Sequence, residues 1–174
     1  MIIVSNYLFS TTNLIFPDDI VVRLNLAWMK DKAEAQSTLK SIKHDVYLDY
    51  PQGRSKPPKP ILSLAEAIAI AKKFKNVKYF AVSNVEEPKE VEKIRKLLPS
   101  HIEFVPKIET KRGVKNIAAI MHAGKSKHAM LDKEDLYLDV QKDSDIFEIL
   151  CGAARSRAKE HGFKLLELHG VVFA

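Results

Sequence analysis

The sequence predicts an α/β fold, a compact or incomplete (β/α) barrel of the TIM type with parallel strands. Two observations favour this class. Strand-like and helix-like patterns alternate along the chain with short connections, and polar residues repeatedly follow the apolar strands. With 174 residues and 46% hydrophobic composition, residues 1–174 can form a single domain with a substantial core. A full barrel usually needs about 200 residues or more, so we expect a compact barrel, one that lacks its last βα unit, or one that a neighbouring subunit closes.

The strands are predicted from short apolar runs that end in polar or turn-forming residues. Six runs of this kind span Ile20–Asn25, Asp45–Asp49, Val77–Ser83, Ile102–Lys107, His128–Asp132 and Lys164–Leu168. All but the last are followed by a segment long enough to cross back over the sheet, as parallel strands require.

Helices fill the segments between these strands, and their ends carry recognisable signals. A Ser-x-x-Glu capping box, a proline in a first turn and terminal glycines mark the boundaries. The four helices expected from these signals cover residues 63 to about 75, 88 to about 98, 113–124 and 143 or 144 to 162.

One segment, residues 51–60, contains four prolines and is predicted to be an extended loop. It follows a strand, which places it at the mouth of the barrel. Two interpretations stay open, a stiff spacer and a loop that covers the substrate.

Charge and composition narrow the classes of partner. The net charge is +6, but lysines and arginines are scattered among carboxylates, as in residues 89–96, which is typical of a solvated helix face. We find neither zinc-knuckle spacing nor an aromatic–basic ribbon, so no nucleic-acid partner is expected. No apolar run is long enough for a membrane span. The opening residues lack a basic n-region and Cys151 is the single cysteine, which together predict a cytoplasmic protein.

Two short runs, residues 105–116 and 130–136, carry the clearest chemical signal. Each is an apolar strand that ends in carboxylates, and a helix-like segment lies between them. A right-handed strand–helix–strand unit brings the carboxyl ends of both strands to the same edge, so Glu109 and Asp135 would point into one mouth. Two carboxylates suit Mg²⁺ or Mn²⁺, with water and substrate as further ligands. The alternative is that both simply favour a helix N-terminus.

Polar residues that end other strands should converge on the same face of a barrel. Arg23 could pair with a developing oxyanion, and Asp49 could act as a water-mediated metal ligand or as an acid/base group. Lys107 points the same way as Glu109 and could be a second cation over the substrate. Two structural alternatives stay open: Arg23 as an ionic bridge to Glu109 or Asp135, and Lys107 as an ordinary partner of a neighbouring carboxylate.

The predicted set would suit enolate chemistry. A metal held by Glu109 and Asp135 would chelate a 2-oxo acid through its carbonyl and carboxylate oxygens. It would stabilise the enolate that forms when a carbon–carbon bond breaks or a proton leaves.

Several of these runs resemble the pyruvate-kinase-like (phosphoenolpyruvate/pyruvate) barrel superfamily over about residues 20–170. Val22–Asn25 resembles its Arg-x-Asn strand, and residues 107–117 resemble its "KIE(N/T)xxGVxN" motif. Residues 109–110 and 134–136 are similar to the "IET" and "AEDL" motifs of the citrate lyase β-subunit and 2-oxo-acid aldolase branch. Weaker similarities to the superfamily or to this branch lie at residues 47–54, 80–85 and 153–157.

The resemblance implies that Arg23, with Asn25 beside it, binds substrate and that Glu109 and Asp135 bind Mg²⁺. Asp132 and Lys133 fill positions that the aldolase branch gives to glycine and alanine, whose backbone amides hold the substrate carboxylate. We therefore expect both residues at substrate-binding positions, with a changed charge. The nucleotide-covering and regulatory domains of pyruvate kinase have no counterpart in the sequence, so kinase activity is not expected.

The resulting hypothesis is a Mg²⁺-dependent carbon–carbon lyase or aldolase that acts on a 2-oxo acid or a related acyl substrate through an enolate. Its catalytic residues would be Arg23, Lys107 and Asp49. The alternative is a catalytically degenerate barrel that binds an anionic metabolite or a partner protein. The expected partners are a small anionic substrate and a second copy of the chain, because a missing unit would leave an open sheet edge.

Overall fold

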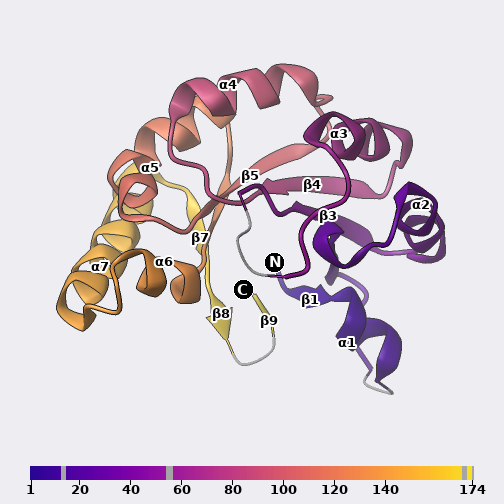
Figure 1. Ribbon diagram of the computed structural model, residues 1–174, viewed down its shortest axis with the longest axis horizontal. Coiled ribbons are helices and arrows are strands. Elements are labelled where there is room, and N and C mark those ends of the chain that lie inside the picture. The colour runs from indigo at the N-terminus through magenta and orange to yellow at the C-terminus, as the bar shows by residue number, and fades with distance from the viewer. Residues whose placement is uncertain (13–14, 54–56, 170–171, 174) are drawn as a thin grey trace.

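The computed structural model describes residues 1–12, 15–53, 57–169 and 172–173. Within these residues, nine strands form one curled sheet, and helices cover its outer side (Figure 1). In spatial order the strands run β7-β6-β5-β4-β3-β2-β1-β9-β8. Their bounds are β1 Ile3–Ser5, β2 Val21–Asn25, β3 Asp45–Tyr50, β4 Val77–Val82, β5 Glu103–Ile108, β6 His128–Leu131, β7 Lys164–Leu166, β8 Leu168–His169 and β9 Val172–Phe173.

Seven of these strands, β1 to β7, pair in parallel with their neighbours in chain order. Strand β9 pairs antiparallel with β1, and β8 pairs antiparallel with β9. The described residues therefore form an incomplete α/β barrel, which confirms the predicted parallel sheet. Where a further βα unit would follow β7, this chain has a short antiparallel hairpin. The predicted oligomer stays a prediction.

The helices are α1 Asn6–Thr11, α2 Lys32–Ser41, α3 Leu64–Lys73, α4 Pro88–Leu97, α5 Lys111–Gly124, α6 Lys133–Asp139 and α7 Ser144–His161, with a 3₁₀ turn η1 at Leu26–Trp28. The four predicted helices are present as α3, α4, α5 and α7. Ser63 caps α3 in the predicted capping box, and Gly162 ends α7 with a positive φ of 70°. No helix among the described residues is long and apolar enough to cross a membrane.

One predicted boundary was wrong in a way that affects the site. The strand expected over His128–Asp132 ends at Leu131, and Asp132 is instead the N-cap of α6. Its Oδ1 accepts a hydrogen bond from the backbone N–H of Asp135 at 3.4 Å. This cap turns the chain into a helix, so Asp135 lies in a first helical turn and not on a strand.

The sheet has two apolar faces, because successive side chains on a strand point to opposite sides. The outward face packs against the helices. The inward face holds one buried residue from each parallel strand: Ile3, Val21, Tyr47, Ala81, Val105, Met130 and Leu166. Within this inner layer the Tyr47 hydroxyl donates to the Met130 sulfur at 3.7 Å, and burial raises the pKa of Tyr47 well above its usual value. The barrel interior is therefore a packed floor and not a channel.

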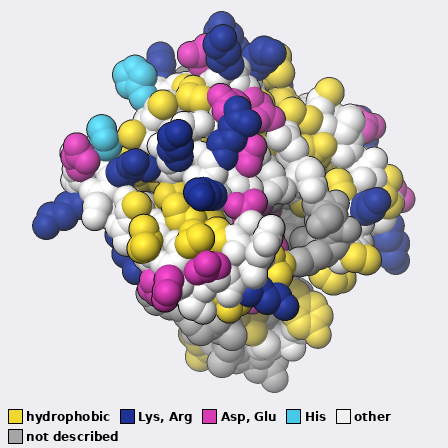
Figure 2. All heavy atoms as spheres, turned by 60° about the vertical axis from the view of Figure 1, so that its left-hand side comes forward, with side chains coloured by type: hydrophobic (Ala, Val, Ile, Leu, Met, Phe, Trp, Pro, Cys, Tyr) yellow, Lys and Arg dark blue, Asp and Glu magenta, His cyan; other side chains and the backbone are white. Residues whose placement is uncertain are grey.

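The face of the molecule in Figure 2 carries lysine and arginine side chains interspersed with aspartate and glutamate. Oppositely charged surface residues at such spacing contribute little stability individually. One group of ion pairs has a carboxylate that is better shielded from water. It is centred on Glu167, the single residue between β7 and β8. Its carboxylate accepts from Arg155 at 2.9 and 2.7 Å and contacts the Lys133 ammonium at 3.2 Å.

These contacts should make stability depend on pH. Hydrogen bonds from Arg155 outweigh the effect of burial and lower the pKa of Glu167 to about 2, against 4.5 for the free side chain. A lowered pKa adds stability above about pH 4.5 that is lost as the pH falls toward 2. We expect Glu167→Gln to cost about 1 kcal/mol at pH 7, given that Arg155 is half exposed. Urea unfolding should show this cost shrinking below pH 4.5, whereas exposed Glu160→Gln should show little cost at either pH.

Close packing of α5 against the loop after β4 depends on Gly113. A Cβ at this position would lie 2.9 Å from the backbone oxygen of Val85, and the carbonyl has no flexible end that can move aside. The first turn of α5 can therefore approach this loop only because residue 113 has no side chain.

Gly113→Ala should lower the free energy of unfolding by about 1–3 kcal/mol, because backbone must shift to relieve the contact. Gly152→Ala is the matched control, since a Cβ at this position in α7 meets nothing within 4 Å. The control should be neutral or stabilising by about 0.5–1 kcal/mol. Equal effects of the two substitutions in urea unfolding would contradict the close approach.

Candidate active site

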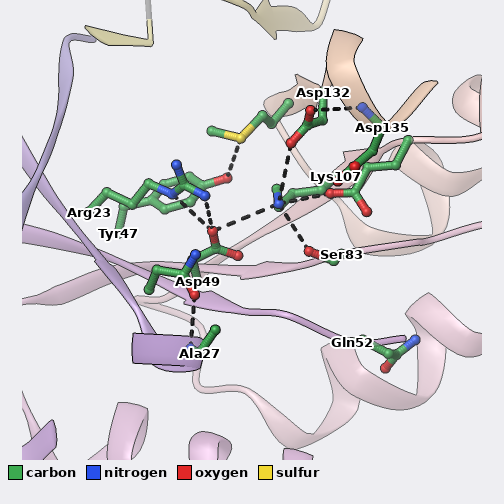
Figure 3. Close-up of polar contacts among 12 residues, drawn as sticks. Arg23, Ala27, Tyr47, Asp49, Gln52, Ser83, Lys107, Asp132 and Asp135 are labelled. Atoms are coloured by element: carbon green, nitrogen blue, oxygen red, sulfur yellow. Dashed lines mark hydrogen bonds and ion pairs between the residues drawn. The ribbon is translucent and has the colours of Figure 1, made fainter. Parts of the chain in front are cut away.

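A layer of polar side chains lies directly above the apolar floor, at the carboxyl edge of the sheet. Each member stands two residues after a member of the inner layer and so points to the same side of its strand. They are Arg23 on β2, Asp49 on β3, Ser83 after β4, Lys107 on β5 and Asp132 after β6. Because the strands are parallel, these residues from five neighbouring strands meet at one mouth (Figure 3).

Lys107 lies at the centre of this layer. Its ammonium donates to Ser83 Oγ at 3.0 Å and contacts Glu109 Oε1 at 2.8 Å. The Asp49 and Asp132 carboxylates each approach it to 3.8 Å. Burial lowers the pKa of Lys107, but the charges of Asp49 and Glu109 outweigh burial, and the net pKa is raised. The residue is 5% exposed, and its side chain is therefore a buried ammonium ion.

Arg23 is held in place by Asp49. Its Nε donates to Asp49 Oδ2 at 2.9 Å, and its Nη2 donates to the same oxygen. Burial lowers the pKa of Arg23, but Asp49 more than offsets this effect. The sequence left open a bridge from Arg23 to Glu109 or Asp135; the contact found is with Asp49, which is itself fully buried. A buried carboxylate that fixes a guanidinium in this way sets the direction of its remaining donors.

Three carboxylates gather on the other side of Lys107. Oxygens of Glu109, Asp132 and Asp135 lie within 4.8 Å of one another. Glu109 Oε2 accepts from the backbone N–H of Asn84 at 2.9 Å, and burial raises the pKa of Glu109 although Lys107 opposes this shift. Asp132 and Asp135 belong to the cap and first turn of α6. Hard oxygen donors grouped this closely fit a single Mg²⁺ or Mn²⁺ ion.

Charges of both signs meet at this site. Among the described residues, the charged cluster consists of four carboxylates, Asp49, Glu109, Asp132 and Asp135, and two cations, Arg23 and Lys107. Buried charges are tolerated when they are paired, and each of the two cations has a carboxylate partner here.

A cavity of about 330 Å³ opens above the cluster. Of the residues predicted from the sequence, those that line it are Arg23, Asn25, Lys107, Glu109, Asp132 and Asp135. Two predicted residues are not among its lining. Asp49 lies beneath Arg23, and the Lys133 ammonium pairs with Glu167 at 3.2 Å. Asn25 also has a structural contact, because its Oδ1 caps η1 by accepting from the Ala27 N–H.

Sequence reasoning did not assign roles to Ser83 and Asn84, or ligand character to Asp132. Ser83 was expected only among the polar residues that end strands, and its two-residue offset is the signal that assigns it to this layer. Asn84 has a positive φ of 54°, which turns its N–H toward Glu109. That conformation leaves little trace in a sequence, since asparagine tolerates it better than most residues do. Of the predicted proline loop at 51–60, residues 54–56 lie outside the described part.

The sequence matches no protein-family model, and no curated protein matches it. The fold is similar to solved structures at low identity. Citrate synthase SbnG is 13% identical, with a TM-score of 0.65 over 88% of this chain and 69% of that chain. The citrate lyase β subunit from M. tuberculosis, complexed with oxaloacetate and magnesium, is 17% identical, with a TM-score of 0.64 over 84% of this chain and 67% of that chain.

A third similar structure is a HpcH/HpaI aldolase/citrate lyase family protein from Burkholderia cenocepacia J2315. It is 11% identical, with a TM-score of 0.67 over 86% of this chain and 71% of that chain. At such identities these similarities establish the fold, and the chemistry has to be argued from the residues of this chain.

Proposed function

We propose that this protein is a Mg²⁺-dependent carbon–carbon lyase or aldolase that acts on a 2-oxo acid or a related acyl substrate through an enolate. The observation that carries the proposal is the charged cluster: the three grouped carboxylates line one cavity together with Arg23 and Lys107. The similarity in fold to a citrate lyase β subunit complexed with oxaloacetate and magnesium supports the same chemistry.

Glu109, Asp132 and Asp135 would hold the metal ion. When bound, Mg²⁺ supplies Lewis-acid stabilisation of negative charge on a substrate oxygen. The three carboxylates come from two separate elements, the end of β5 and the start of α6. Metal binding would therefore depend on the packing of α6 against the mouth of the barrel.

Arg23 and Lys107 supply the positive charge on the protein side. Arg23 lines the cavity in an orientation fixed by Asp49, so it can bind a substrate carboxylate or a developing oxyanion. Lys107 is held by Ser83 and Glu109 and adds a second cation next to the reacting atoms. Asp49 is buried beneath Arg23, and we assign it a positioning role in place of acid/base chemistry.

Glu109→Gln should abolish Mn²⁺ binding in calorimetric titration, because it removes a charged ligand from the centre of the carboxylate group. Oxalate, a mimic of the pyruvate enolate, should tighten Mn²⁺ binding to the wild-type protein. Glu134→Gln is the matched control: this residue is exposed, lies between two of the proposed ligands in sequence, and should leave the titration unchanged. Full Mn²⁺ affinity in Glu109→Gln would show that the carboxylates are structural.

Lys107→Met should separate metal binding from catalysis. The ammonium lies 2.8 Å from Glu109, so it repels a cation bound by the same carboxylate. Removal of this ammonium should raise the affinity for Mn²⁺ by about tenfold or more. A tenfold change corresponds to about 1.4 kcal/mol, which is small for the loss of a repulsion between charges at such short range. Cleavage of 2-oxo acids should fall in the same variant. Unchanged metal affinity would mean that Lys107 and the metal do not share the site.

A second candidate, a degenerate barrel that binds an anionic metabolite without turnover, has one observation in its favour. Glu109 already has an ammonium partner in Lys107, so the cluster is partly neutralised without a metal. A screen of 2-oxo acids with Mn²⁺ distinguishes the two candidates. Bond cleavage that disappears in Glu109→Gln supports the enzyme, whereas binding without cleavage supports the degenerate barrel.

A further inference from the structure

A second groove adjoins the charged cavity. It has a volume of about 590 Å³ and lies where β2 and η1 meet the start of α1. Two of its lining residues, Arg23 and Asn25, also line the charged cavity, so the two spaces share a wall. Arg23 therefore borders both the charged cavity and the groove.

Beyond this shared wall the groove presents two aromatic side chains beside the polar residues of α1 and its cap. Trp28 and Tyr7 line it and are 65% and 77% exposed, and the partly buried Met29 also lines it. Large aromatic side chains bury much area when a partner covers them, and they prefer stacked or edge-on contacts with other rings. Two aromatic residues that stand uncovered on one groove are typical of a binding surface.

Local hydrogen bonds fix the two elements that present these rings. Asn25 Oδ1 accepts from the Ala27 N–H and begins the turn that carries Trp28. Ser5 Oγ accepts from the Leu8 N–H and begins α1, which carries Tyr7. Asn25 and Ser5 line the groove themselves. The aromatic residues are therefore placed by short-range caps and not by long flexible loops.

We propose that this groove binds the remote part of the substrate, a planar aromatic group attached to the carboxylate that Arg23 holds. The inference rests on the proposed function for the identity of the charged end. Charge complementarity sets the orientation of the ligand in the groove. Its anionic end faces the Arg23 guanidinium, and its apolar ring lies against Trp28 and Tyr7. The substrate class is thus an aromatic 2-oxo acid or acyl compound, selected over short analogues such as pyruvate.

Tryptophan fluorescence tests this assignment directly, because Trp28 is the only tryptophan in the chain. In the Mn²⁺-loaded protein, phenylpyruvate should shift the Trp28 emission maximum and bind at least tenfold more tightly than pyruvate in calorimetry. 3-Phenylpropionate, which has the ring and the carboxylate but no 2-oxo group, should shift the emission without any metal. Equal affinities for phenylpyruvate and pyruvate would overturn the proposal.

Variants provide the residue-level test. Tyr7→Ala and Trp28→Ala should each weaken phenylpyruvate binding several-fold or more while leaving the affinity for oxalate unchanged. Both residues are exposed, so neither substitution should unfold the protein. Ile149→Ala, an exposed apolar residue on α7 that does not line the groove, is the control and should change neither affinity.

The outcomes separate this inference from the proposed function. If Mn²⁺ and oxalate bind but phenylpyruvate binds no more tightly than pyruvate, the groove assignment fails and the metal site stands. If 3-phenylpropionate shifts Trp28 emission but Mn²⁺ does not bind, the proposed function fails and the groove stands. If the Trp28 emission maximum changes with protein concentration in the absence of ligand, the assignment is overturned. That result would indicate that a second copy of the chain covers the groove.

Discussion

The contacts of the Lys107 ammonium are the interactions on which the rest of the site depends. From β5 it reaches a side chain on β3 and side chains that directly follow β4 and β6, as well as Glu109 directly after its own strand. A buried charge is tolerated only when its surroundings replace the water it has lost. Here the carboxylates of Asp49, Glu109 and Asp132 do so. Two of the proposed metal ligands, Glu109 and Asp132, are therefore also ion-pair partners of Lys107.

The apolar floor gives that ion pair its strength. Tyr47 and Met130 close the barrel interior beneath the charged cluster and keep water from reaching it from below. Electrostatic interactions are stronger where water is excluded, so the same charges would contribute much less on an open surface. Strand alternation places floor and cluster two residues apart on each strand, which couples hydrophobic packing to the geometry of the polar layer.

Sequence reasoning predicted the parallel sheet and the convergence of Glu109 with Asp135, because both follow from chain direction and right-handed crossovers. It missed β1, β8 and β9, which at two or three residues are too short to show a period. It also placed Asp132 on a strand, since an aspartate after an apolar run can end a strand or cap a helix. The partner of Arg23 depends on the register between β2 and β3, and neither strand specifies that register on its own.

The pairing of β1 with β9 has a consequence for how the protein folds. Strand β1 stands near the beginning of the chain and β9 near its end, yet they are hydrogen-bonded neighbours in the sheet. Such a contact raises the contact order, because almost the whole chain must be organised before the pair can form. The local βα units can assemble progressively, whereas the hairpin has to wait for them. We therefore expect the pairing of β9 with β1 to be the late event of folding, with that edge of β1 exposed to water until then.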